Sequence, residues 1–347
     1  MPGIRMVCMA PARALLSLLL AAATGLAAET VKTSDIISLV RSSIQAHEPD
    51  QKLAKALHKL RLSERLDSRA VEELESEGAG PLAAAELERL RESSEQLPEA
   101  SEPPSFPHPA APDAAEQWRT LERARRVALG YVGSLPDFIC SESIQRYQNT
   151  KGSWELKDTV ELTLTYFGHQ EDYHVVSING RPSLGAYDEI GGAISRGEFG
   201  TILREIFDPA SAAEFNWDHW TTLRHHPAHV YWFRVPRERS EYHIAFGQYN
   251  RFQRSVVVGQ HGFIYVDQDT GKVLRVLADA DSFPDGFAVR SSSTHIDYDA
   301  VEISGRSFLL PIKAEVRMAT RDIRTRNAVR FHGYRKFGSE SSISFDK

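Results

Sequence analysis

The second half of the chain alternates apolar and polar residues with a period of two. Between residues 159 and 166 the apolar side chains are Val160, Leu162, Leu164 and Tyr166, and every position between them is Thr or Glu. Alternate side chains of a strand point to opposite faces, so each such strand has one buried face and one wet face. Antiparallel sheets commonly bury only one face. The pattern therefore predicts a large antiparallel sheet.

Turn signals divide this region into strands. Asn179-Gly180 predicts a tight hairpin turn, residues 267–271 predict a hairpin loop that ends in glycine, and Ser304-Gly305 predicts another turn. Further strands are expected at residues 173–178, 230–235, 242–246, 255–259, 262–267, 272–277, 294–303, 308–318 and 327–337.

Two helices are expected among these strands. Asp113 is placed to cap a helix whose apolar stripe is Trp118, Leu121, Ala124, Ala128 and Tyr131. A second helix, over residues 199–207, has Phe199, Ile202, Leu203, Ile206 and Phe207 on one face. Antiparallel strands with helices packed across them predict an α+β domain over residues 113–347.

Proline sets the boundary of this domain. Six prolines lie between residues 98 and 112, and proline stiffens a chain and cannot donate a backbone hydrogen bond. Residues 99–112 are predicted to be a linker. Residues 29–98 are predicted to form a small helical bundle, with apolar faces at Ile36, Ile37, Val40 and Ile44, at Leu53, Leu57, Leu60 and Leu66, at Val71 and Leu74, and at Leu82, Leu87, Leu90 and Leu97.

The first 28 residues have the pattern of a secretory signal peptide. Arg5 and Arg13 precede an apolar run over residues 14–23, and small residues follow at 25–28. The run is short of the ~20 residues that span a bilayer, which argues against a membrane anchor. Cys8 precedes the run, so lipid attachment there is not expected. The sequence predicts a periplasmic or secreted protein, cleaved near residue 27 or 28 and not lipidated.

Cleavage would leave Cys140 as the one cysteine, and one thiol forms no internal disulfide. Cys140 follows Phe138-Ile139, and in this apolar context we expect a small buried side chain in preference to a nucleophile.

Charge argues against one class of partner. The chain has 41 Lys and Arg against 47 Asp and Glu, and residues 29–102 have 10 basic against 16 acidic residues. Nucleic-acid binders have a positive excess, so no nucleic-acid partner is expected.

Residues 306–336 are the exception, with nine basic and two acidic residues. This segment suggests contact with an anionic membrane surface or an acidic partner. A solvated outer face that prevents strand aggregation is the favoured alternative. The basic residues singled out are Arg317, Arg321, Arg324, Arg326 and Arg330.

His225, His226 and His229 are the candidate metal ligands. Pro227 interrupts any helix, and on a strand His225 and His229 would lie ~13 Å apart, too far for one ion unless the chain turns. A loop is therefore favoured over a metal site. No catalytic serine motif and no Gly-rich phosphate loop is present, so no catalytic residue and no cofactor are expected.

Two pairs of segments resemble a known family. Residues 262–267 with 271–274, and residues 298–303 with 305 and 308–311, are similar to the closing hairpins of the bacterial lipoprotein-carrier half-barrel superfamily (LolA-like, with the related periplasmic sigma-factor regulators). The layout also resembles a group of exported bacterial proteins with the same two parts. The resemblance covers residues 113–346. It implies a strongly curved sheet covered by helices, no catalytic residues, and a concave apolar surface that can hold an acyl chain or a segment of another protein.

The expected function is thus a non-enzymatic exported binding protein for a hydrophobic ligand, such as a lipid, or for a partner segment. The residues expected to line its concave site are Phe199, Leu203, Phe207, Trp217, Trp220 and Trp232, with core packing as the alternative for the aromatic ones. Two other functions stay open: an envelope scaffold that binds a protein through the helical bundle, and a metal-dependent hydrolase that uses the three histidines.

Overall fold

The structure is a computed structural model. It describes residues 29–337 except 101–109, 151–153, 169, 186, 188–189, 191–197 and 249–250. The predicted signal peptide and most of the predicted linker lie outside the described residues. Contacts divide the chain into two compact units, residues 1–105 and 106–347.

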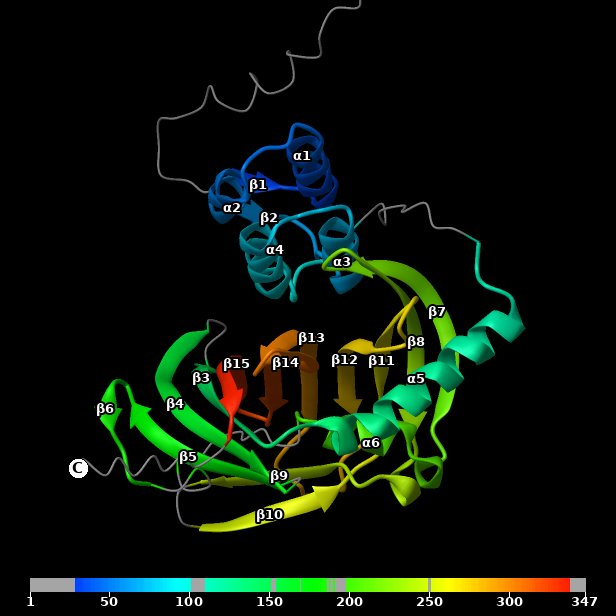
Figure 1. The fold of residues 1–347 in the computed structure, drawn as a ribbon. Helices are drawn as coiled ribbons and strands as arrows, with labels where there is room; N and C mark the ends of the chain where they lie inside the picture. The colour runs from blue at the N-terminus through cyan, green and yellow to red at the C-terminus, as the bar shows by residue number, and fades with distance from the viewer. Residues whose placement is uncertain are drawn as a thin grey trace, which may run out of the picture. The chain divides into compact units, whose positions relative to one another are not determined.

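The described part of the N-terminal unit has four helices and two short parallel strands (Figure 1). The helices are α1 (Thr33–Gln45), α2 (Asp50–His58), α3 (Ser68–Ser76) and α4 (Pro81–Ser93), and the strands are β1 (Glu29–Val31) and β2 (Leu60–Leu62). Three residues expected on helices lie outside them: α2 ends at His58, so Leu60 lies in β2 and Leu66 in the segment before α3, and α4 ends at Ser93, before Leu97. The buried apolar residues are Ile36, Ile37, Val40, Leu53, Leu57, Leu62, Leu66, Ala70, Val71, Leu74, Ala83, Leu87 and Leu90.

Carboxylates from distant positions cap two of these helices. The backbone N–H groups of Leu82 and Ala83 donate to the two oxygens of Asp50, at 2.8 and 2.9 Å. A side chain at Gly80 would place its Cβ 2.4 Å from the Asp50 carboxyl carbon, so this cap requires glycine there. Glu64 accepts from the N–H of Thr33 at 3.0 Å in the same way. Each carboxylate satisfies free N–H groups and opposes the positive end of a helix.

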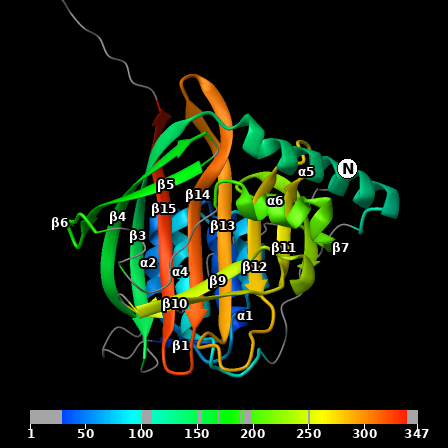
Figure 2. The ribbon, with the colours of Figure 1, turned by 90° about the horizontal axis from the view of Figure 1, so that it is seen from below.

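The C-terminal unit is built on a curved antiparallel sheet (Figures 1 and 2). Among the described residues the sheet has eleven strands in the order β6-β5-β4-β3-β15-β14-β13-β12-β11-β8-β7, and it is open at both ends. The strands are β3 (Phe138–Asn149), β4 (Glu155–Phe167), β5 (Gln170–Ile178), β6 (Arg181–Pro182), β7 (Glu214–Leu223), β8 (His226–Val235), β11 (Gln260–Asp267), β12 (Val273–Ala280), β13 (Ser291–Ile303), β14 (Arg306–Ala319) and β15 (Arg324–Lys336).

A separate hairpin of β9 (His243–Gln248) and β10 (Arg251–Val257) crosses the lower part of this unit in Figure 1. No helix among the described residues is both long enough and apolar enough to cross a membrane.

The eleven-stranded sheet and the helices confirm the prediction of an α+β protein with a large curved antiparallel sheet.

Helices α5 (Ala114–Ser134) and α6 (Thr201–Phe207) pack on the concave face of the sheet (Figure 1). Asp113 accepts from the N–H of Glu116 at 2.7 Å, which confirms the predicted cap. Trp118, expected in the buried stripe, is instead 60% exposed, because the buried Thr120 faces the sheet at this end of α5. The rest of the predicted stripe is buried.

Two long strands of this sheet were not predicted. On β3 the inward-facing positions include Glu142 and Arg146, which break the apolar alternation. On β7 the register shifts between Trp217 and His219, so no single alternation runs along the strand. The loop expected over residues 225–229 is shorter than predicted, because β8 already begins at His226 and only a two-residue turn joins it to β7. This turn consists of Arg224 and His225, both in the left-handed region (φ 47° and 69°), where glycine or asparagine is usual.

Candidate functional site

The part of the concave face under α6 is filled by the protein's own side chains. Phe199, Leu203 and Phe207, three of the predicted ligand-lining residues, are each 1% exposed. The Phe199 ring lies 5.4 Å from the rings of both Phe138 and Phe331. Phe207 stacks on Phe215 at 5.6 Å. The structure thus places these residues in a packed core.

The other end of the concave face, on β5, is less completely covered. Tyr173, Val175 and Ile178 pack against the core, but each remains half-buried. A pocket of about 530 Å³ lies at the β5–β6 hairpin, and its lining includes Ile178 of this row together with Arg181 and Pro182. The pocket therefore joins the end of the apolar row on β5 to one cation.

An aromatic row lies on the concave side of β7 and β8, and we name it by its members Trp217, Trp220, His229 and Tyr231. Successive ring centroids are 5.9, 4.1 and 6.1 Å apart. The register shift in β7 is what brings Trp217 and Trp220 to the same face. The row also holds the start of α5, because Tyr231 donates to the carbonyl of Gln117 at 3.0 Å and Trp220 donates to that of Ala110 at 3.0 Å.

Trp232, the sixth predicted lining residue, does not join this row. It follows Tyr231 on β8 and pairs with Phe263 of β11. Phe263 packs with a small apolar cluster on the convex face, around Val230 and Tyr265. Trp232 is a correction to the predicted site, because side chains alternate along a strand and the concave positions are those of Tyr231 and Phe233.

The structure does not bring the three histidines together. His225 is exposed in the turn before β8, and His226 begins the strand with its Nδ1 3.2 Å from an oxygen of Asp267. His229 is 1% exposed and belongs to the aromatic row on the concave face. Since His226 and His229 point to opposite faces of β8, the three side chains share no site.

Beside the aromatic row lies a second pocket, of about 410 Å³, between α5, β8 and the turn that joins β11 to β12. His229 lines this pocket, and its Nδ1 has no hydrogen-bond partner among the described residues. Burial, and then the charge of Arg123, lowers the pKa of His229 to about 4, so the imidazole is neutral at pH 7.

Sequence reasoning missed a set of buried polar groups on the concave face. Glu142 of β3 is 3% exposed, and its Oε1 has no hydrogen-bond partner among the described residues. Burial, with the charges of Glu198 and Glu171 added, raises the pKa of Glu142 well above its usual range. The hydroxyl of Tyr131 is also buried without a partner in the described chain. Glu142 lies two residues from both the buried Cys140 and the buried Ile144, but this spacing indicates its face only once residues 138–149 are known to be a strand.

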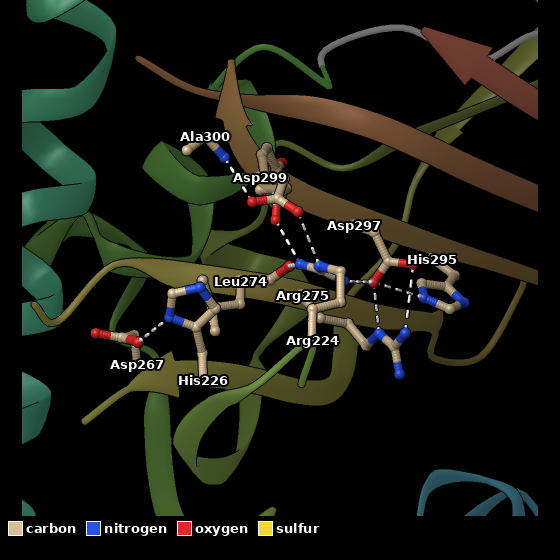
Figure 3. Close-up of polar contacts among 10 residues, drawn as sticks. Arg224, His226, Asp267, Leu274, Arg275, His295, Asp297, Asp299 and Ala300 are labelled. Carbon is tan, nitrogen blue, oxygen red and sulfur yellow. Dashed lines mark hydrogen bonds and ion pairs between the residues drawn. The ribbon is translucent and has the colours of Figure 1, made fainter. Parts of the chain in front are cut away.

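The convex face carries an ion-pair network centred on Asp297 of β13 (Figure 3). The Arg275 Nε lies 2.6 Å from one oxygen of Asp297, and the Arg224 Nη1 lies 3.6 Å from the same oxygen. Arg224 extends from the β7–β8 turn and donates to the carbonyls of Tyr298 (2.6 Å) and Leu274 (3.3 Å). The neighbouring cations outweigh desolvation, so the pKa of Asp297 lies well below its usual range.

The basic segment lies at the end of β14 and β15. Arg317 and Arg326 flank Glu315, with Nε–carboxylate distances of 2.6 and 2.7 Å. Arg321, Arg324 and Arg330 are exposed. Contact of these residues with an anionic surface stays a prediction.

Cys140 is fully buried on β3, as the sequence predicted. Burial raises the pKa of its thiol far above neutrality, so the thiolate is suppressed.

No protein-family model matches the chain. No curated protein sequence matches it either.

Several solved structures are similar. A LolA superfamily protein from Nitrosomonas europaea is 9% identical, with 66% of this chain and 97% of that chain covered and a TM-score of 0.32. A DUF1329 family protein from Desulfovibrio piger is 12% identical, with 65% and 94% covered and a TM-score of 0.29. A Vibrio parahaemolyticus domain described as an outer membrane lipoprotein-sorting protein is 9% identical, with 65% and 94% covered and a TM-score of 0.30.

The first of these structures belongs to the superfamily that the two hairpins resemble in sequence. With TM-scores of this size the matches do not carry the fold assignment, which rests on the sheet order and the packing of α5 and α6.

Proposed function

We propose that this chain is a non-enzymatic, exported binding protein of the cell envelope that holds the apolar part of a ligand on the concave face of its sheet. The observation that carries the proposal is that side chains are buried to different extents along that face. The part under α6 is packed, whereas Tyr173, Val175 and Ile178 on β5 are half-buried beside a pocket of about 530 Å³.

The chemistry of this end suits an acyl chain. Three apolar side chains of one strand face give a continuous wall, and burying an apolar surface of that kind contributes about 25 cal/mol per Å². Arg181 lines the same pocket and supplies a cation for an acidic headgroup. The segment of another protein, rich in apolar residues, would use the same wall.

The test compares two neighbouring valines of β5. Val175 is half-buried against the core, whereas Val176 is 51% exposed. We expect Val175→Asp to abolish the fluorescence increase of a dansyl-labelled fatty acid, because a carboxylate on the wall opposes the apolar chain. Val176→Asp, which makes the same chemical change, is expected to bind the probe like the unmodified protein.

Circular dichroism of both variants shows whether the sheet is retained. Absence of probe binding by the unmodified protein, or equal loss in both folded variants, would overturn the acyl-chain proposal. Native mass spectrometry of protein purified from its host then identifies the ligand class, or shows a bound peptide in place of a lipid.

A further inference from the structure

The pocket beside His229 lies at the opposite end of the sheet from β5 and has a different character. Its volume is about 410 Å³, and its lining includes Glu116, Arg119 and Arg123 from one face of α5. His229 of β8 and Asp269 of the β11–β12 turn complete the opposite wall. Charges of both signs therefore surround one cavity.

Arg123 is held in a fixed position. Its Nη1 donates to the carbonyls of Gln268 (3.2 Å) and Asp269 (2.9 Å). A side chain at Gly271 would place its Cβ 2.7 Å from the Arg123 Cγ, so the arginine stem lies directly on this glycine. The turn itself is fixed by Asp267, which accepts from the N–H of Thr270 at 2.7 Å. The guanidinium is thus preorganised beside the pocket.

Other charged side chains of the pocket are not engaged. Arg119, Glu116 and Asp269 form no side-chain ion pair or hydrogen bond with any residue that the structure describes. The buried His229 adds a ring nitrogen without a partner in the described chain. Burying an unsatisfied polar atom is unfavourable, and a ligand that forms a hydrogen bond with it would recover part of that cost.

We infer that this pocket binds a small zwitterionic group, with an acidic group held by Arg119 and Arg123 and an amine held by Glu116 and Asp269. The balance of two cations and two carboxylates with a neutral imidazole favours such a ligand over a simple anion. Phosphoethanolamine has this chemistry, both as a free compound and as the headgroup of a phospholipid. The aromatic row beside the pocket provides an apolar surface for the adjoining carbon atoms.

Isothermal titration calorimetry of the full chain with O-phosphoethanolamine tests the inference. Inorganic phosphate and ethanolamine serve as probes that carry charge of one sign only. We expect the zwitterion to bind more tightly than either probe. Arg119→Ala should weaken its binding at least tenfold, since a charge-assisted hydrogen bond is lost. Arg126→Ala, which removes an exposed arginine of α5 that does not line the pocket, should leave the affinity unchanged.

His229→Phe keeps a ring beside Trp220 but removes the ring nitrogens, and it should weaken binding while thermal unfolding shows that the fold is kept. Competition by phosphatidylethanolamine vesicles would identify a lipid headgroup as the source. Binding of the free compound without such competition would identify a soluble ligand. No binding of O-phosphoethanolamine, equal binding of phosphate alone, or equal weakening by Arg126→Ala would overturn the inference.

Discussion

The two faces of the sheet treat their carboxylates in opposite ways. On the convex face, arginines contact Asp297 and Glu315, and the pKa of each lies below its usual range. On the concave side, burial is the largest influence on Glu142 and Glu205, and the pKa of each is raised, although the charge of Arg204 lowers that of Glu205 in part. Each face has an exception: Arg146 forms an ion pair with Asp158 on the concave side, and burial raises the pKa of Asp279, whose position next to the concave Ala278 places it on the convex side. The comparison teaches that ion pairs hold most of the buried carboxylates of the convex face ionised, whereas burial on the concave face favours the neutral form of Glu142 and Glu205.

Removing the central charge of the convex network should have the largest effect. Asp297→Asn keeps the shape of the side chain but leaves Arg275 and Arg224 without their shared carboxylate. Breaking a buried ion pair costs about 3–5 kcal/mol, so we expect a loss of that size in the free energy of unfolding. Urea titration at pH 7 measures it.

The unmodified protein and Asp297→Asn can also be compared as a function of pH. Because the folded-state pKa of Asp297 is lowered, its contribution is present above the unfolded pKa of about 4 and is lost as the pH falls through the folded value. The difference in the free energy of unfolding between the two proteins should therefore become smaller in acid. A difference that stays constant down to the acid transition would contradict the network's role. Asp299→Asn, at a more exposed carboxylate of the same network, is the matched control and should cost less than 1 kcal/mol.

The concave core should tolerate a conservative change better. Phe199→Leu keeps an apolar side chain among Phe138, Phe331 and Tyr166, and we expect it to cost about 1–2 kcal/mol. The same denaturant titration measures this loss. A loss as large as that of Asp297→Asn would mean that shape matters as much on the concave face as charge does on the convex one.

Local sequence signals predicted the neutral part of this fold. The alternation of β4 placed Val160, Leu162, Leu164 and Tyr166 on the buried face, and all four are at most 2% exposed. Asn179-Gly180 and Ser304-Gly305 form the predicted turns, with positive φ at all four residues. These features depend on neighbours in sequence, so the sequence alone is sufficient to find them.

The charged features could not be predicted in this way. Arg224 meets Asp299 across 75 positions of sequence, and no local pattern pairs them. Strand β3 was not recognised because two of its inward-facing residues, Glu142 and Arg146, are charged. In the sequence such residues look solvent-facing until the partner strands are known. The error at Trp232 has the same cause. The alternation along β8 shows that Tyr231 and Trp232 face opposite ways, but only the pairing with β11 shows which of them is on the convex side.

Glu205 of α6 offers the most selective test of the comparison, because its effect should depend on pH. Burial raises its pKa to about 7, and the bond donated by Gln260, at 3.4 Å, offsets this only in part. A raised folded-state pKa means that the stabilising contribution is complete below the unfolded value, about 4.5, and is lost as the pH rises through 7. Glu205→Gln, which is neutral at every pH, should therefore match the unmodified protein near pH 4 and be more stable by up to about 3 kcal/mol at pH 8. Thermal unfolding at the two pH values measures the difference, with Thr201→Ala, at an exposed and uncharged position of the same helix, as the control whose effect should not change with pH. A variant that is less stable at pH 8 would show that the concave face accommodates this charge, and the contrast between the two faces would then not extend to α6.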